Sequence, residues 1–413
     1  MKKNYLLVGS GSRGIHMFAK PMVDQFKETA SLVGLMDINI KRAEAANKIL
    51  KTNLPVYNDF NKAMKELKID TVLVATRDSQ HVEYIIKSLK AGKDVVTEKP
   101  LCIDAAQCKK ILKTQKETKK KVYVTHNYRY QPCMMLIKKM LKEGVIGDIL
   151  FIDFHEKLDR LHGADYFRRW HRVKKNSGGL MIHKSCHCFD LMNWFVDSEP
   201  VEVVATGDLV VYGKNGKFRS KRCRGCAHQS KCEFYVDMFP ENSEANDLYL
   251  NAESEDKYYR DACVYDKEID IEDIANVLYY YKNGVRVDFS LMAFTTYEGI
   301  DIIIEGTKGR LEYSVIHDNS WMAGKVTVHG LASSLGEKLV LYTSEGVKNM
   351  EIPKAEGTHG GSDPLLRKDI FIERIPNSPL ATLEEGINAV LVGDAANKSI
   401  KTGKPVKIKD LRK

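Results

Sequence analysis

The sequence NYLLVGSGSRG, residues 4–14, joins a short apolar run to the pattern GxGxxG. The apolar run predicts a buried strand, and a helical pattern follows it. At such a turn Gly9 permits the sharp bend, Gly11 lets a pyrophosphate approach the backbone, and Gly14 lets the helix pack on the strand. This stretch therefore predicts a dinucleotide-binding turn.

Short apolar runs continue to alternate with helical periods up to about residue 125. The further predicted strands are Ser31–Met36, Asp70–Ala75, Asp94–Thr97 and Lys121–Thr125, and the predicted helices are Ile40–Leu50, Asn61–Leu67, Gln80–Leu89 and Asp104–Thr118. Repeated βα units form a parallel, doubly wound sheet. We therefore expect an α/β Rossmann domain over residues 1–125.

The pattern changes in residues 126–413. Helical spacing is clearest in Met134–Leu141 and in Leu180–Val196, which follows Gly178-Gly179. The predicted strands are then Val201–Val211, Val277–Tyr281, Val285–Met292, Ile300–Ile304 and Arg310–Val315. This pattern predicts an α+β domain with a mainly antiparallel sheet and helices on one side. A polar insertion covers roughly residues 213–272.

Asp37 ends the second predicted strand, where a carboxylate can hold a ribose 2′-hydroxyl. A 2′-phosphate would face the negative charge of Asp37, so the position favours NAD over NADP, although Arg42 nearby weakens the argument. The residues expected to bind the cofactor lie at the ends of successive strands. They are Gly9, Ser10, Gly11, Ser12, Arg13, Gly14, Asp37, Thr76, His81, Glu98 and Lys99.

Three further motifs follow the glycine-rich turn in order along the chain. They are Thr97-Glu98-Lys99-Pro100, the Gly178-Gly179 helix that carries His187, and the closing stretch from Ala396 to Val406. With these motifs the chain resembles the glucose-fructose oxidoreductase, inositol dehydrogenase and rhizopine-catabolism (Gfo/Idh/MocA) family over nearly its whole length. The resemblance implies an NAD-dependent oxidoreductase that acts on a sugar, cyclitol or sugar-derivative hydroxyl.

By the same resemblance, Lys99 is the catalytic lysine beside the nicotinamide and His187 is its acid/base partner. Oxidation of an alcohol releases a hydride and a proton, so an ammonium that stabilises the developing alkoxide and an imidazole that takes the proton suit the reaction. Two alternatives stay open. One is a redox-neutral lyase or hydrolase that oxidises the sugar transiently, and the other is a non-catalytic dinucleotide or sugar sensor.

His183 departs from the pattern of many relatives, which carry an Asp four residues before the catalytic histidine. On one continuous helix His183 and His187 would share a face. His183 could then contact substrate or relay protons, serve as a structural histidine, or form a metal pair with help from His359 or Asp363. The residues expected to bind substrate are Asn127, Arg129, Trp170, His171, His183, His187 and His359.

Four cysteines in or near the polar insertion have spacing typical of a metal site. Cys223, Cys226 and Cys232 lie close in sequence, and Cys263 is a candidate fourth ligand. A C-x2-C pair can share one tetrahedral ion, and a structural zinc would order a segment with little core of its own. An Fe–S centre and free thiols are the alternatives.

Composition excludes several other classes of protein. The net charge of +9 is spread along the chain among acidic residues, which argues against a nucleic-acid surface. No apolar stretch is long enough to span a membrane, and the start lacks the core of a signal peptide. Nine cysteines, an odd number, fit a reducing cytoplasm better than a disulfide framework. The resemblance implies a homodimer or homotetramer with a small-molecule carbohydrate substrate.

Overall fold

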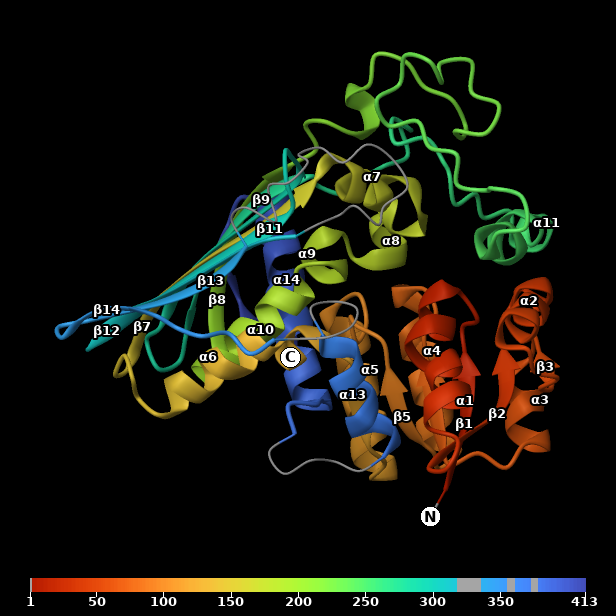
Figure 1. The fold of residues 1–413 in the computed structure, drawn as a ribbon, viewed down its shortest axis with the longest axis horizontal. Coiled ribbons are helices and arrows are strands. Elements are labelled where there is room, and N and C mark those ends of the chain that lie inside the picture. The colour runs from red at the N-terminus through yellow and green to blue at the C-terminus, as the bar shows by residue number, and fades with distance from the viewer. Residues whose placement is uncertain (1, 318–335, 355–360, 373–377) are drawn as a thin grey trace. The chain divides into compact units, whose positions relative to one another are not determined.

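The computed structural model describes residues 2–317, 336–354, 361–372 and 378–413. The chain forms two compact units, each built around one sheet (Figure 1). The first unit comprises Met1–Tyr130, Asp237–Arg260 and Gly357–Ile387. The second comprises Gln131–Val236, Asp261–Glu356 and Asn388–Lys413.

The first unit contains a seven-stranded sheet in the order β15-β6-β5-β4-β1-β2-β3. Its strands are β1 (Lys3–Val8), β2 (Ala30–Met36), β3 (Val56–Tyr57), β4 (Thr71–Val74), β5 (Asp94–Thr97), β6 (Val122–Val124) and β15 (Ala381–Thr382). All neighbours pair in parallel except β15, which is antiparallel to β6. The predicted parallel sheet is therefore confirmed.

The carboxyl ends of the central strands are in register. Val8 lies opposite both Met36 and Val74, Val74 lies opposite Thr97, and Thr97 lies opposite Val124. The residues that follow these positions consequently line one edge of the sheet, which is the edge where doubly wound folds bind ligands.

Some helices of the first unit begin at a side chain that caps their free N–H groups. The carboxylate of Asp59 accepts from Asn61 N, and that of Asp104 accepts from Gln107 N. The helices are η1 (Gly14–Ala19), α1 (Lys20–Gln25), α2 (Ile40–Leu50), α3 (Phe60–Glu66), α4 (Asp78–Lys90), α5 (Ala105–Thr118), η2 (Asn127–Tyr130), η5 (Asn246–Leu250), α11 (Glu253–Asp256) and α13 (Ser362–Phe371).

The second unit contains a nine-stranded sheet in the order β14-β13-β12-β11-β7-β10-β9-β8-β16. Its strands are β7 (Ile149–Asp159), β8 (Pro200–Asp208), β9 (Ile274–Tyr281), β10 (Arg286–Thr295), β11 (Gly299–Gly306), β12 (Gly309–Ile316), β13 (Glu337–Thr343), β14 (Gly346–Asn349) and β16 (Val406–Lys407). Only β7 and β10 pair in parallel within the described residues, so the predicted, mainly antiparallel sheet is confirmed.

The helices of the second unit are mostly short. They are α6 (Pro132–Lys142), α7 (Arg160–Arg168), η3 (Trp170–Arg172), α8 (Lys174–Ser177), α9 (Leu180–His183), α10 (Cys186–Val196), η4 (Gly213–Asn215) and α15 (Ile408–Arg412). The long helix α14 (Leu383–Thr402) runs through the position where the two units are divided. In the described ranges, no helix is both long and apolar enough to cross a membrane.

Two differences between the predicted and the observed elements have a clear cause in the hydrogen bonds. The single helix expected over 180–196 is two helices, because Ser185 N bonds to Leu180 O and His187 N bonds to Lys184 O, which interrupts the regular helical hydrogen bonds. The strand expected over 201–211 ends at Asp208. The backbone N–H groups of residues 210–212 donate instead to the carboxylate of Asp273, at 2.7–3.1 Å.

The core of the second unit includes an aromatic contact between the sheet and α10. Phe289 of β10 is fully buried, and its ring centroid lies 5.0 Å from that of Phe189 on α10 and 5.8 Å from that of Phe154 on β7.

Replacing the ring of Phe289 should destabilise the second unit strongly. We expect Phe289→Ala to lower its free energy of unfolding by about 3–5 kcal/mol, because the substitution removes buried surface and leaves a cavity. Leu278→Ala is the matched control on β9, since Leu278 is 52% exposed, and it should change the value by less than about 0.5 kcal/mol. Denaturant unfolding followed by circular dichroism measures both, and equal losses would contradict the assigned core.

Candidate active site

The glycine-rich turn between β1 and η1 has the close backbone contacts that its sequence predicts. Gly9 has φ +98°, and a Cβ there would lie 2.4 Å from the carbonyl oxygen of Ala75. A Cβ on Gly14 would lie 2.2 Å from the carbonyl oxygen of Gly9. The hydroxyl of Ser10 is buried and has no hydrogen-bond partner among the described residues. These features fit a dinucleotide, whose phosphates need close backbone and free polar groups.

Asp37 follows β2 and is fixed against this turn. Its Oδ2 accepts from Ser10 N at 2.8 Å, and its Oδ1 accepts from Asn39 N at 2.9 Å. Burial raises the pKa of Asp37, and the guanidinium of Arg42 acts in the opposite direction. The carboxylate is therefore held rigidly at the end of the second strand, where a ribose would lie.

Charged residues from three parts of the first unit form one network. Arg13 Nε lies 2.8 Å from Glu98 Oε1, and the Arg13 guanidinium also lies 3.5 Å from Asp363. Asn127 Nδ2 donates to Asp363 Oδ1 at 2.9 Å, and the backbone N–H of Lys99 donates to Glu98 Oε2 at 3.2 Å. The network thus brings together four of the predicted site residues.

Asp78, at the start of α4, is a buried residue of this region that the sequence patterns did not single out. It is 2% exposed, and burial raises its pKa well above the ordinary value even though Lys99 acts to lower it. Its position could have indicated it as a candidate site residue, because Asp78 is a carboxylate only a few residues after the end of β4.

His81 connects the ends of β4 and β5. Its Nδ1 lies 2.8 Å from the carbonyl oxygen of Pro100, and its Nε2 lies 3.2 Å from that of Thr76. Burial lowers the pKa of His81, which favours the neutral ring. The ring lies between the two loops that carry these carbonyl groups, and in its neutral form it donates to one of them at a time.

Arg129 is placed differently from the network. It is 1% exposed, and its NH1 group lies 2.6 Å from Glu385 and 3.4 Å from the carbonyl oxygen of Pro379. These contacts join η2 to the C-terminal part of the first unit. His359, which was also predicted to bind substrate, lies outside the described residues.

In the second unit, the ring of His183 lies in an aromatic cluster. Its centroid is 4.5 Å from that of His171, 5.4 Å from that of Trp170 and 5.7 Å from that of Tyr166. The structure thus brings three predicted substrate residues together. His187 is 6% exposed and lies on α10, whereas His183 ends α9.

A buried ion pair and a half-buried one lie on or beside the elements that carry this cluster. Lys184 Nζ lies 2.9 Å from Glu156 Oε1, and His162 Nδ1 lies 2.7 Å from Glu298 Oε2. Burial acts to raise the pKa of Glu298, but His162 outweighs it and the pKa falls to about 2. Glu156 was missed, yet it lies in the inward-facing phase of β7, between Phe154 and Leu158. A carboxylate at an alternating position between two apolar residues of a strand could have indicated it as a buried charged residue.

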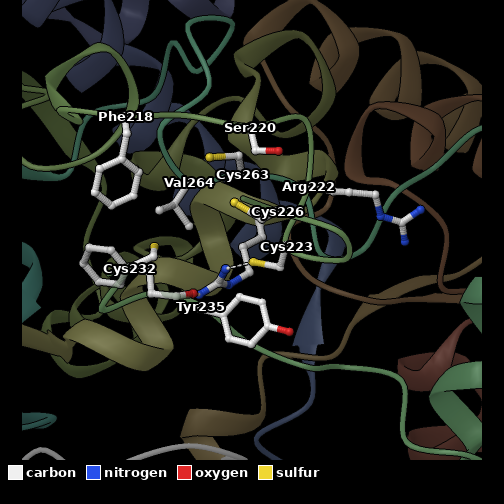
Figure 2. A pocket seen from close by; sticks show the side chains of 11 residues that line it. Phe218, Ser220, Arg222, Cys223, Cys226, Cys232, Tyr235, Cys263 and Val264 are labelled. Carbon is white, nitrogen blue, oxygen red and sulfur yellow. Dashed lines mark hydrogen bonds between the residues drawn. The ribbon is translucent and has the colours of Figure 1, made fainter. Parts of the chain in front are cut away.

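Figure 2 shows the pocket that is lined by Cys223, Cys226, Cys232 and Cys263. Across the described part of the chain, no three His, Cys, Asp or Glu side chains are arranged to hold a metal ion. The predicted structural zinc is therefore not supported. Instead, Arg168 NH1 lies 3.4 Å from Cys223 Sγ, and burial raises the pKa of that thiol.

Aromatic and ionic contacts hold this insertion together. The ring of Phe234 packs against Tyr212 at 5.3 Å and against Tyr265 at 5.8 Å. Asp261, which is 1% exposed, pairs with Arg222 through a 2.9 Å hydrogen bond to Nε. The segment therefore has an aromatic and ionic core of its own, contrary to the expectation from its polarity.

Known protein families match both parts of this chain. The family model described as "Oxidoreductase family, NAD-binding Rossmann fold" matches residues 3–126, and "Oxidoreductase family, C-terminal alpha/beta domain" matches residues 138–408. YteT of Bacillus subtilis is 35% identical over 99% of this chain and 98% of its own length. Inositol 2-dehydrogenase of Rhizobium meliloti is 30% identical over 35% of this chain and 41% of its own length.

A solved structure of levoglucosan dehydrogenase with NADH and L-sorbose has the same fold, with a TM-score of 0.71 and 18% identity over the full length of both chains. The two family models together cover most of the sequence. The chain therefore belongs to the Gfo/Idh/MocA oxidoreductase family and carries its NAD-binding Rossmann domain.

Proposed function

We propose that this protein is an NAD-dependent oxidoreductase that transfers a hydride between a hydroxyl of a sugar, cyclitol or sugar derivative and the nicotinamide ring. The observation that carries the proposal is the glycine-rich turn with Asp37 bonded to it and the Glu98 network at the same sheet edge. Inositol 2-dehydrogenase and levoglucosan dehydrogenase, by their names, act on compounds of this class. NAD, when bound, would supply the hydride acceptor.

We assign the proton chemistry to Lys99 and His187. An ammonium at Lys99 would donate a hydrogen bond to the substrate oxygen and stabilise its negative charge as the C–H bond breaks. The imidazole of His187 would take the hydroxyl proton, because its ordinary pKa lies near neutral pH. Glu98 supports this assignment, since its carboxylate accepts from the Lys99 backbone and thereby orients the loop.

The aromatic cluster suits a carbohydrate. Trp170, His171 and His183 present ring faces and ring nitrogens within one small region of the second unit. Rings of this kind pack against the C–H face of a sugar while polar tips bind its hydroxyls. We propose that these three residues contact the substrate, and that the Asn127 amide, bonded to Asp363 in the first unit, does so as well.

A panel of free sugars, cyclitols and aryl glycosides tests the reaction class. We expect NADH to form in proportion to the hydroxyl compound consumed, because dehydrogenation leaves the hydride on the cofactor. Absorbance reports NADH, and the coloured aglycone reports cleavage in the same samples. Aglycone release without net NADH would instead establish the redox-neutral alternative.

Lys99→Ala should remove turnover while it leaves NAD binding nearly intact. We expect kcat to fall by at least about 100-fold on the best substrate of the panel, since loss of an acid–base group typically costs 10²–10⁴-fold. The dissociation constant for NAD should stay within about threefold, because the turn and Asp37 carry binding. Lys90→Ala, at the exposed end of α4, is the control and should change neither value. Equal loss of binding and turnover would count against the assignment.

A further inference from the structure

A segment from the second half of the sequence packs on the nucleotide-binding turn. Asp237–Arg260 belongs to the first unit, and Leu248 and Tyr249 of η5 are buried in its core. The hydroxyl of Tyr249 accepts from Ser12 N at 3.0 Å, and Asn39 Nδ2 donates to Ala252 O at 2.8 Å. The segment therefore packs against the turns that follow β1 and β2.

The segment Asp237–Arg260 packs around the guanidinium of Arg42. Arg42 is 8% exposed and lies on α2, one turn beyond Asp37. Its NH1 group lies 3.3 Å from Asp37 Oδ1, and its NH2 group lies 2.8 Å from Asp256 Oδ2. Its Nε donates to Leu248 O at 3.2 Å. The cation is thus held between two carboxylates and oriented by a backbone carbonyl.

The arrangement bears on the one chemical difference between NAD and NADP. A 2′-phosphate carries close to two negative charges and is bound in Rossmann domains by an arginine near the end of the second strand. Arg42 has the position for that role, but its donors already point at Asp37 and Asp256. Burial acts to raise the pKa of Asp256, but Arg42 and the other hydrogen bonds of the carboxylate together lower the pKa, so Asp256 is ionised at neutral pH.

We propose that Asp256 is a positioning residue for cofactor choice: it holds Arg42 against Asp37, denies the guanidinium to a 2′-phosphate and so favours NAD. The inference rests on the proposed dinucleotide function and deepens it. Asp256 acts through Arg42 and needs no contact with the cofactor. One carboxylate from a distant segment thereby keeps the net charge of the triad negative, which opposes a further anion.

The test measures dissociation constants of the full chain for NAD⁺ and NADP⁺ by calorimetry. Asp256→Asn removes the negative charge that pairs with Arg42, and we expect the affinity for NADP⁺ to rise about tenfold relative to that for NAD⁺. Asp256→Glu should restore the preference of the natural chain. Arg42→Ala added to Asp256→Asn should abolish the gain, because the freed guanidinium is then missing.

Asp247→Asn is the matched control in the same segment. Asp247 pairs at 2.7 Å with Lys48, which is 72% exposed, so this variant should bind both cofactors as the natural chain does. If Asp256→Asn folds poorly by thermal melting, Asp256→Ser tests the same lost charge. An unchanged NAD⁺ to NADP⁺ ratio, or an equal loss for both, would overturn the role of Asp256. Failure of the natural chain to bind NAD⁺ would instead refute the dinucleotide function itself.

Discussion

The backbone contact between Gly9, Gly14 and Ala75 is the constraint on which the rest of the site depends. Any side chain at either glycine would overlap a carbonyl oxygen at less than 2.5 Å, so the ends of β1 and β4 could not approach. Because the neighbouring strands are in register with β1, this approach also fixes where Asp37 and Glu98 emerge. The chemistry at the sheet edge follows from main-chain packing rather than from the polar residues themselves.

Those polar residues form mutually dependent groups. Arg13 bridges Glu98 and Asp363, and Arg42 bridges Asp37 and a carboxylate from a distant segment. A buried charge is tolerated when it is paired, but removal of one partner leaves the other uncompensated at considerable cost. Each network therefore connects the site to parts of the chain that are remote in sequence. A change in one member alters the interactions of the other members.

Local patterns predicted much of this architecture. The strand Asp94–Thr97 was predicted to the residue, because the apolar or β-branched run Val95–Thr97 is short and lies between polar turns. The break between α9 and α10 was missed, since no glycine or proline marks it and the cause is a shifted hydrogen-bond pattern around Ser185. The packing of Tyr249 on the nucleotide turn was also beyond local patterns, because it joins polar segments more than 200 residues apart. The structural zinc is not supported, and the cysteine spacing gives no information on the contact of Cys223 with Arg168.

The chain enters the first unit three times, and this affects how the protein can form during translation. The edge strand β15 pairs with β6, Tyr5 donates to the carbonyl of Ile370 on α13, and the ring of Phe371 packs on Tyr5 at 5.4 Å. The amino-terminal sheet cannot complete these contacts while the ribosome is still synthesising the middle of the polypeptide. A nascent Rossmann unit would therefore expose an incomplete core until residues 362–382 have been synthesised, and exposed apolar surface of this kind favours aggregation.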